Sequence, residues 1–136
     1  MENPKLIVSA RERDLLMSWI ADFTPPDINT QKSLAKLTEE LRQADVRKET
    51  DLPGDVVRVG SIVTVKSPSI RKEGLQLVMP KDADLKANKL SIFTVMGAAL
   101  IGYRQGTEIT WMLPKGEEVI LLEKVDNSRV TDLGQG

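Results

Sequence analysis

The sequence contains no cysteine and no histidine. The absence of cysteine excludes disulfide bonds and thiolate metal sites. The absence of histidine removes the commonest general base and the commonest metal ligand, and it excludes a nucleophilic triad of the Ser-His-Asp type. Aromatic residues are few, with two tryptophans, one tyrosine and two phenylalanines, so leucine, isoleucine and valine must fill the core.

Long apolar runs are also missing. No stretch approaches the roughly 18 consecutive apolar residues of a membrane-spanning helix, and the N-terminus lacks the apolar segment of a secretory signal. We therefore expect a soluble cytoplasmic protein with no membrane partner.

The charges are nearly balanced, with 19 Lys plus Arg, 20 Asp plus Glu and a net charge of −1. Residues 58–89 are locally basic, which is compatible either with a solvated sheet edge and loops or with a patch that touches phosphates. No aromatic residues alternate with these basic residues, as a base-stacking surface requires. We expect no sequence-specific nucleic-acid binding.

Residues 1–50 have helical periodicity. Ser9 and Glu12 have the spacing of a capping box, and an apolar stripe follows. The stripe consists of Leu15, Leu16, Trp19, Ile20 and Phe23. Residues 24–27 end this helix because proline lacks an amide proton, and a second amphipathic helix begins near 29–30. The pattern predicts a short antiparallel helical hairpin. Its apolar stripe can be covered within the hairpin or by a second copy, so the oligomeric state stays open.

Residues 51–126 have strand patterns and one short helix. Val57, Val59, Val63 and Val65 are predicted to share one face of a strand, with a bulge at Gly60. The further expected strands are 75–79, 90–95, 109–113 and 117–125. A short helix is expected at 97–101, followed by a left-handed Gly102, and tight turns are expected at Gly106 and 114–116. Residues 127–136 are expected to form a flexible tail. The prediction is an α+β domain in which a twisted antiparallel sheet packs against one short helix.

Residues 90–116 follow the pattern L-S-I-x-x-x-x-G-A-A-L-I-G-Y-R-x-G-x-E-I-x-W-x-x-P-x-G. This pattern resembles the C-terminal domain of the bacterial GreA/GreB transcript-cleavage factors, and it is closer still to their short relatives of the Rnk type (regulator of nucleoside diphosphate kinase). The resemblance covers roughly 52–125. It implies an FKBP-like fold for 51–126, preceded by a truncated coiled coil in 1–50.

The resemblance also implies a docking segment for RNA polymerase. In Gre factors, the loop between the Ser-Ile strand and the short helix docks on the tip of the coiled coil in the β′ subunit, and it usually reads Asp-Ser-Pro or Asn-Ser-Pro. The corresponding residues here are Phe93, Thr94, Val95 and Met96. Two interpretations stay open: an exposed apolar version of this contact, or ordinary core residues of a strand and a helix start.

The hairpin tip is predicted at Pro25, Pro26 and Asp27. Gre factors use two tip carboxylates to help hold a magnesium ion in the polymerase active site. This turn has one acid, a weak magnesium site by itself, and Asp27 is better interpreted as the first residue of a helix. Helices of about 14 and 18 residues reach only ~21–27 Å, much less than the coiled coil of the cleavage factors. We expect no bound metal or cofactor.

The sequence therefore predicts a non-enzymatic regulator that binds RNA polymerase at its secondary channel and does not stimulate transcript cleavage. One alternative is an FKBP-like prolyl isomerase or chaperone-like enzyme, which would need several aromatics around a pocket. The sheet region offers only Phe93, Tyr103 and Trp111. Trp111 is expected in the core, and Tyr103 is expected to pack its ring and expose its hydroxyl. The other alternative is a Gre-derived module that binds a different protein.

Overall fold

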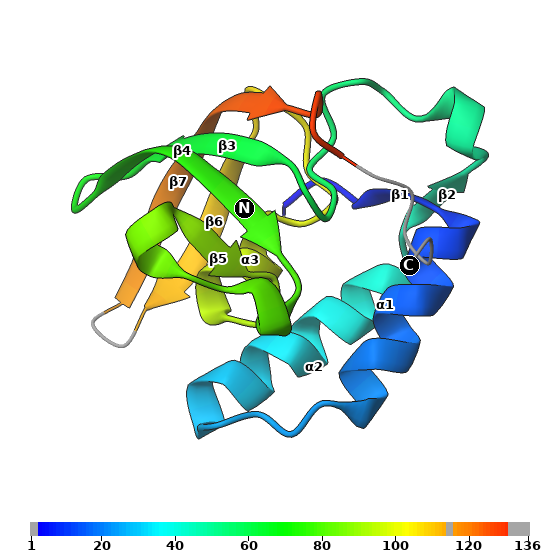
Figure 1. The fold of residues 1–136 in the computed structure, drawn as a ribbon, viewed down its shortest axis with the longest axis horizontal. Helices are drawn as coiled ribbons and strands as arrows, with labels where there is room; N and C mark the ends of the chain where they lie inside the picture. Colours follow the sequence, from blue (N-terminus) through cyan, green and yellow to red (C-terminus); the bar gives the residue numbers. More distant parts are fainter. Residues whose placement is uncertain (1–2, 114–115, 131–136) are drawn as a thin grey trace.

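The chain has a mixed α and β fold in which a helical hairpin lies beside a sheet (Figure 1). A computed structural model describes residues 3–113 and 116–130. In chain order the elements are β1 (Ile7–Ser9), α1 (Ala10–Asp22), α2 (Ile28–Arg42), β2 (Asp45–Arg47), η1 (Glu49–Asp51), β3 (Ile62–Lys66), β4 (Arg71–Val78), η2 (Pro80–Asp82), η3 (Leu85–Ala87), β5 (Lys89–Ser91), α3 (Val95–Leu100), β6 (Glu108–Leu113) and β7 (Gly116–Asp126). The described residues include no helix long and apolar enough to cross a bilayer.

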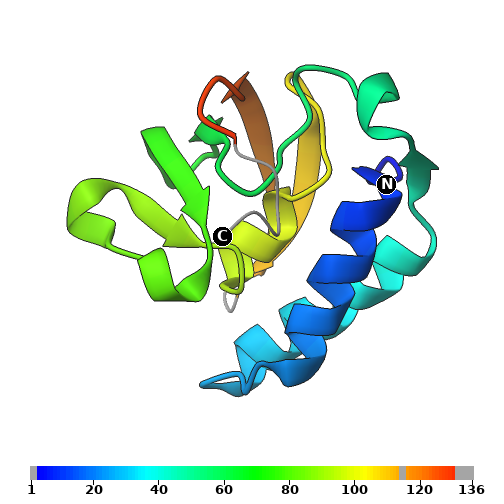
Figure 2. The same ribbon diagram turned by 45° about the vertical axis from the view of Figure 1, so that its right-hand side comes forward.

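The hairpin follows its local sequence signals. The Ser9 hydroxyl accepts from the Glu12 amide at 3.0 Å and begins α1, and the Asp27 carboxylate accepts from the Thr30 amide at 2.8 Å and begins α2. Both predicted helix starts are therefore confirmed. Figure 2 shows the two helices side by side and antiparallel.

The sheet has the strand order β5-β4-β3-β7-β6. Neighbouring strands are antiparallel except for β4 and β5, which run parallel. The expectation of a purely antiparallel sheet is wrong here because residues 79–88, with two short 3₁₀ helices, carry the chain back before β5 begins. A second sheet, the parallel pair of β1 and β2, had no counterpart in the sequence prediction.

Several predicted strands have different bounds, and β4 begins at Arg71, four residues before its predicted start. Val57 and Val59 lie outside β3, since Gly60 adopts a φ of 98° in a turn and the strand begins at Ile62. The bulge lies further along, near Thr64, where the pairing of β3 with β7 shifts. The strand expected over 90–95 ends at Ser91 because the chain turns there and enters α3.

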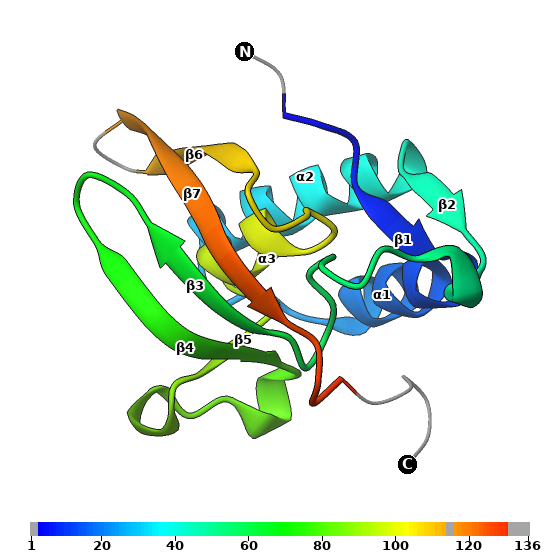
Figure 3. The same cartoon turned by 90° about the horizontal axis from the view of Figure 1, so that it is seen from above.

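One hydrophobic core joins the hairpin to the sheet region. One buried cluster contains Leu77 of β4, Leu100 of α3 and three leucines of α2, Leu34, Leu37 and Leu41. Seen from above, α3 lies between the sheet and the hairpin (Figure 3). The apolar side of α2 is therefore covered by the sheet region of the same chain.

The N-terminal residues also anchor the hairpin. Leu6 is 1% exposed, and the Ile7 amide donates to the Gly102 carbonyl at 2.9 Å. Gly102 has a φ of 88°, as predicted, and a Cβ there would lie 2.8 Å from the Leu6 Cβ. Position 102 therefore requires glycine both for its backbone conformation and for this close approach.

Candidate partner-binding site

The segment 93–96 forms a capped turn at the start of α3. The Thr94 hydroxyl donates to the Ser91 carbonyl at 2.8 Å and accepts from the Gly97 amide at 3.1 Å. The Ser91 hydroxyl accepts from the Phe93 amide at 3.0 Å. Thr94 is thus the N-cap of α3, and both hydroxyls hold the turn in one conformation.

The four predicted docking residues separate into two groups. Phe93 is only 3% exposed, and its ring lies 5.0 Å from the ring of Phe23 near the end of α1, tilted by 52°. Thr94, Val95 and Met96 are half-buried. Phe93 is therefore a core residue. The accessible part of the segment is 94–96.

Gly97 allows α3 to approach this turn closely. A Cβ at this position would lie 2.3 Å from the Ser91 carbonyl oxygen and 2.8 Å from the Ile92 Cα. Real Cβ atoms do not come so close to backbone atoms, so any larger residue would push α3 away. Gly97 thus has a steric role that places Val95 and Met96.

The hairpin tip carries an exposed carboxylate that is already engaged. Asp27 caps α2, and the hydrogen bond from Thr30 lowers the pKa of its carboxyl group. Asp22, the last residue of α1, is a second exposed carboxylate that the sequence reasoning overlooked. Within the described part of the chain, no three acidic residues gather as a cation site would require.

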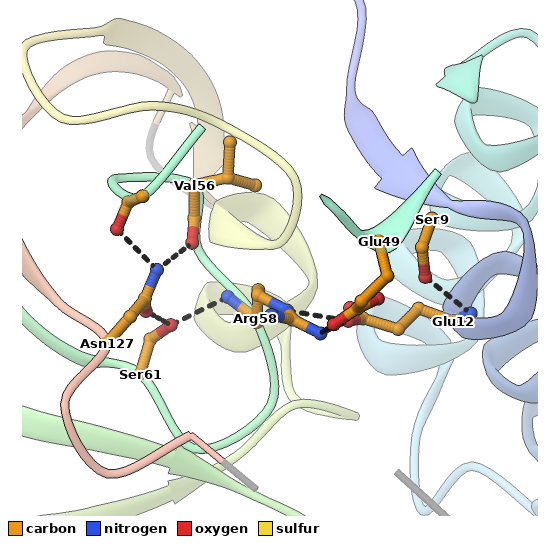
Figure 4. A network of polar contacts seen from close by, with 8 residues as sticks. Ser9, Glu12, Glu49, Val56, Arg58, Ser61 and Asn127 are labelled. Atoms are coloured by element: carbon orange, nitrogen blue, oxygen red, sulfur yellow. Dashed lines mark hydrogen bonds and ion pairs between the residues drawn. The ribbon is translucent and has the colours of Figure 1, made fainter. Parts of the chain in front are cut away.

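An ion-pair network joins the base of the hairpin to the sheet region (Figure 4). Arg58 donates from Nε to the Glu12 carboxylate at 2.6 Å and from Nη2 to both Glu12 and Glu49. Burial disfavours the charge of Arg58, but the two carboxylates outweigh it and raise the pKa of Arg58. The sequence offered no signal for this network, because its members come from three separate segments.

The residues that follow β7 support the same network. The Ser61 hydroxyl accepts from the Arg58 amide at 2.7 Å and donates to the Asn127 side chain. Asn127 in turn donates to the Val56 carbonyl at 2.8 Å. Residues 127–130, part of the predicted flexible tail, make side-chain and backbone hydrogen bonds. Residues 131–136 lie outside the described residues, as do residues 114–115 of the predicted turn at 114–116.

Tyr103 links the sheet region to the middle of α2. Its hydroxyl donates to Glu40 Oε2 at 3.1 Å, and the residue is 3% exposed. The expectation of an exposed hydroxyl is wrong because α2 covers this position. Burial, and then the charge of Glu40, raise the pKa of Tyr103. Trp111, predicted in the core, is half-buried and packs against the core cluster.

The hairpin is therefore held to the sheet region from its base to its far end.

Residues 52–127 match the family described as "Transcription elongation factor, GreA/GreB, C-term", a span of more than half the chain. The chain belongs to the GreA/GreB family. The resemblance found in the sequence is thus confirmed.

Individual relatives agree with this assignment. The chain is 34% identical over 94 residues to "Transcription elongation factor GreA" of Bradyrhizobium sp., covering 68% of this chain and 60% of the relative. It is 32% identical over 96 residues to the protein of the same name from Sphingopyxis alaskensis, covering 71% and 61%. The chain thus spans about 60% of the length of these GreA relatives.

A solved GreA/GreB structure extends the similarity to the hairpin. The "Prokaryotic transcription elongation factor GreA/GreB from Nitrosomonas europaea" is 31% identical with a TM-score of 0.68, and the match covers 90% of this chain and 98% of that one. Because only a tenth of this chain is left uncovered, the match must include most of the hairpin. The fold over 90% of this chain therefore has a counterpart of similar length in the GreA/GreB family.

Proposed function

We propose that this chain is a short, Rnk-type GreA/GreB regulator that binds RNA polymerase at the mouth of its secondary channel. The main observation that supports RNA polymerase as the partner is the membership of residues 52–127 in the GreA/GreB family. The sheet region, which we assign to the FKBP-like fold, docks on the β′ coiled coil, and the protein acts in the cytoplasm as a binding protein rather than an enzyme.

The accessible residues 94–96 supply the docking surface of this proposal. Thr94 keeps a hydroxyl where Gre factors usually have serine, and its two hydrogen bonds hold the turn at the start of α3. Val95 and Met96 follow as half-buried apolar side chains. Apolar side chains on a rigid turn lose little conformational entropy on binding, which favours a stable contact.

The hairpin supports a function without transcript cleavage. The 13 residues of α1 and 15 of α2 correspond to ~20 Å and ~22 Å at 1.5 Å per residue. Phe23 packs against Phe93, and Glu40 accepts from Tyr103, so the hairpin lies along the sheet region. A hairpin held in this way occupies the channel entrance and competes with other channel ligands, and it leaves Asp22 and Asp27 far from the catalytic metal.

The binding experiment uses the full chain and core RNA polymerase, with a GreA protein as competitor. The double variant Thr94→Asp/Val95→Asp should abolish binding. Val119→Asp is the matched control. Val119 is 46% exposed and its neighbour Ile120 is buried, so Val119 lies on the sheet face opposite to the one that packs against the core. Saturable binding that GreA displaces supports the proposal. Equal binding by the double variant and wild type overturns this docking site.

Cleavage is tested separately on backtracked elongation complexes. Addition of the chain should leave the cleavage rate at its intrinsic value, while GreA accelerates it. Asp22→Asn/Asp27→Asn should behave like wild type. Acceleration by wild type that is lost in this double variant would overturn the non-cleaving role and assign the metal-binding function to the tip.

The prolyl isomerase alternative receives little support from the aromatic residues. Phe93 packs against Phe23, and Tyr103 lies beneath α2. Trp111 is left as the half-buried aromatic of the sheet region. A proline-peptide assay with wild type and Trp111→Ala tests this alternative directly, and activity that depends on Trp111 would favour it.

A further inference from the structure

The side chain of Asn3 pairs with the outer edge of β6. Its Oδ1 accepts from the Thr110 amide at 2.9 Å, and its Nδ2 donates to the Thr110 carbonyl at 3.3 Å. β6 is an outer strand of the five-stranded sheet, and β7 is its one neighbouring strand in the described part of the chain. One side-chain amide therefore satisfies both backbone groups that Thr110 directs away from the sheet, as a residue of an added antiparallel strand would.

Asn3 is held in this position by its backbone and by its side chain. The residue before a proline is restricted to extended backbone, and Pro4 applies this restriction to Asn3. Leu6 is buried in the core and anchors the segment that carries Asn3. The Asn3 side chain also hydrogen-bonds to the Tyr103 hydroxyl. In Figure 3 the N-terminal segment lies on the β6 side of the sheet.

The opposite edge of the sheet is also covered by the chain itself. β5 is the other outer strand, and Asp84 exchanges two backbone hydrogen bonds of 2.9 Å with Lys89 of β5. Open strand edges present unpaired amides and carbonyls on which a further strand can form. Each edge of the five-stranded sheet thus receives hydrogen-bonding groups from another segment of the same chain.

The edge that Asn3 covers is complementary to a second copy of itself. Antiparallel pairing about a twofold axis centred on Thr110 places the two Thr110 residues opposite each other. Each Glu108 then lies opposite residue 112 of the other copy. The two acidic side chains therefore do not face each other, and a cross-strand pair of threonines is favourable.

We propose that Asn3 is an edge cap: its side-chain amide occupies the pairing groups of Thr110 and prevents two copies of this chain from joining through β6. Two copies must give up four hydrogen bonds, two from each Asn3, before their β6 strands can pair. This interaction surface is therefore closed while Asn3 is in place and opens when its contact is lost. The proposal concerns the isolated chain and does not depend on RNA polymerase as a partner.

Sedimentation equilibrium of the purified full chain measures this association. Asn3→Ala should raise the self-association constant by about tenfold or more, because each copy no longer breaks two hydrogen bonds before pairing. Lys5→Ala is the matched control, since Lys5 is exposed on the same segment, and it should associate like wild type. Circular dichroism verifies that the variants fold. Equal association of Asn3→Ala and wild type, or an equal rise in Lys5→Ala, overturns the proposal.

A proline at position 110 tests whether β6 forms the contact between copies. The Thr110 amide points toward Asn3 and away from β7, so Thr110→Pro spares the pairing with β7 and removes a donor that a second copy needs. Asn3→Ala/Thr110→Pro should therefore associate no more than wild type. Association of this double variant at the level of Asn3→Ala would show that another surface joins the copies, which overturns the β6 edge.

Amide hydrogen exchange at Thr110 tests the cap in the monomer. In dilute Asn3→Ala, the Thr110 amide should exchange about tenfold faster than in wild type because its acceptor is gone, and concentrating the variant should restore protection. Asn3→Asp keeps an acceptor for this amide and adds a negative charge to each copy, so it should protect Thr110 and associate no more than wild type. Fast exchange in Asn3→Asp, or unchanged exchange in dilute Asn3→Ala, overturns the cap.

Discussion

Arg58 Nε lies 2.6 Å from Glu12 Oε1, and this bond joins the first turn of α1 to the segment that leads into β3. The Glu12 side chain is 6% exposed and that of Arg58 17% exposed. Glu12 is buried and Arg58 is partly buried, so removing one member of the pair leaves the other charge poorly solvated. The contact therefore fixes the base of the hairpin against the sheet region.

Removing one partner of this pair should be costly. Glu12→Gln should lower the free energy of unfolding by about 1–3 kcal/mol, because the partly buried Arg58 loses one of its two charged acceptors. Urea denaturation measures the change. Arg47→Met, which removes the exposed pair with Asp45, is the control and should have little effect. In a double-mutant cycle, strictly additive effects of Glu12→Gln and Arg58→Met would contradict the coupling.

The contact between Phe23 and Phe93 should anchor the far end of the hairpin. Phe93→Ala should destabilise the protein by about 3–5 kcal/mol, since it removes a buried ring and leaves a cavity. Phe23→Ala should cost less, because Phe23 is only partly buried. In Phe23→Ala, amide hydrogen exchange should be faster in the last turn of α1, with little change in β3. Uniform acceleration across the chain in Phe23→Ala would argue against a local anchor.

The N-cap at Thr94 should depend on the ability of the side chain to accept a hydrogen bond rather than on its size. Thr94→Val should lower the free energy of unfolding by about 1 kcal/mol, because the Gly97 amide loses its acceptor. Thr94→Asp should retain most of the stability, since aspartate is a good N-cap. Thermal unfolding compares the two variants. Equal destabilisation by both would show that the hydroxyl bond to the Ser91 carbonyl, rather than the cap, holds the turn.

Tyr103 should make stability depend on alkaline pH. Burial and Glu40 raise the pKa of Tyr103 in the folded state, whereas an unfolded tyrosine ionises near pH ~10. Its contribution is therefore fully present below pH ~10 and is lost as the pH rises toward the folded-state pKa. Tyr103→Phe should be less stable at neutral pH and should lose less stability above pH ~10. Parallel pH profiles for the two proteins would contradict the shift.

Several features were predictable because the responsible atoms lie within a few residues of one another. Ser9 and Asp27 accept from amides three residues later, so a cap shows in the local pattern. Gly102 and Gly106 adopt the positive φ that their positions at a helix end and a tight turn suggested. The ordered motifs of 90–116 likewise identified the GreA/GreB family before any fold was known.

The positions of these elements relative to one another depended on contacts that no local pattern encodes. The parallel pairing of β4 with β5, the Phe23–Phe93 contact and the Glu12–Arg58 pair all join separate segments. Each pair forms only when the shared core has brought its segments together. The sequence by itself thus determined the helices, most of the strands and the family. The tertiary structure alone placed the hairpin along the sheet region, buried Phe93 and left 94–96 accessible, because these outcomes depend on long-range packing.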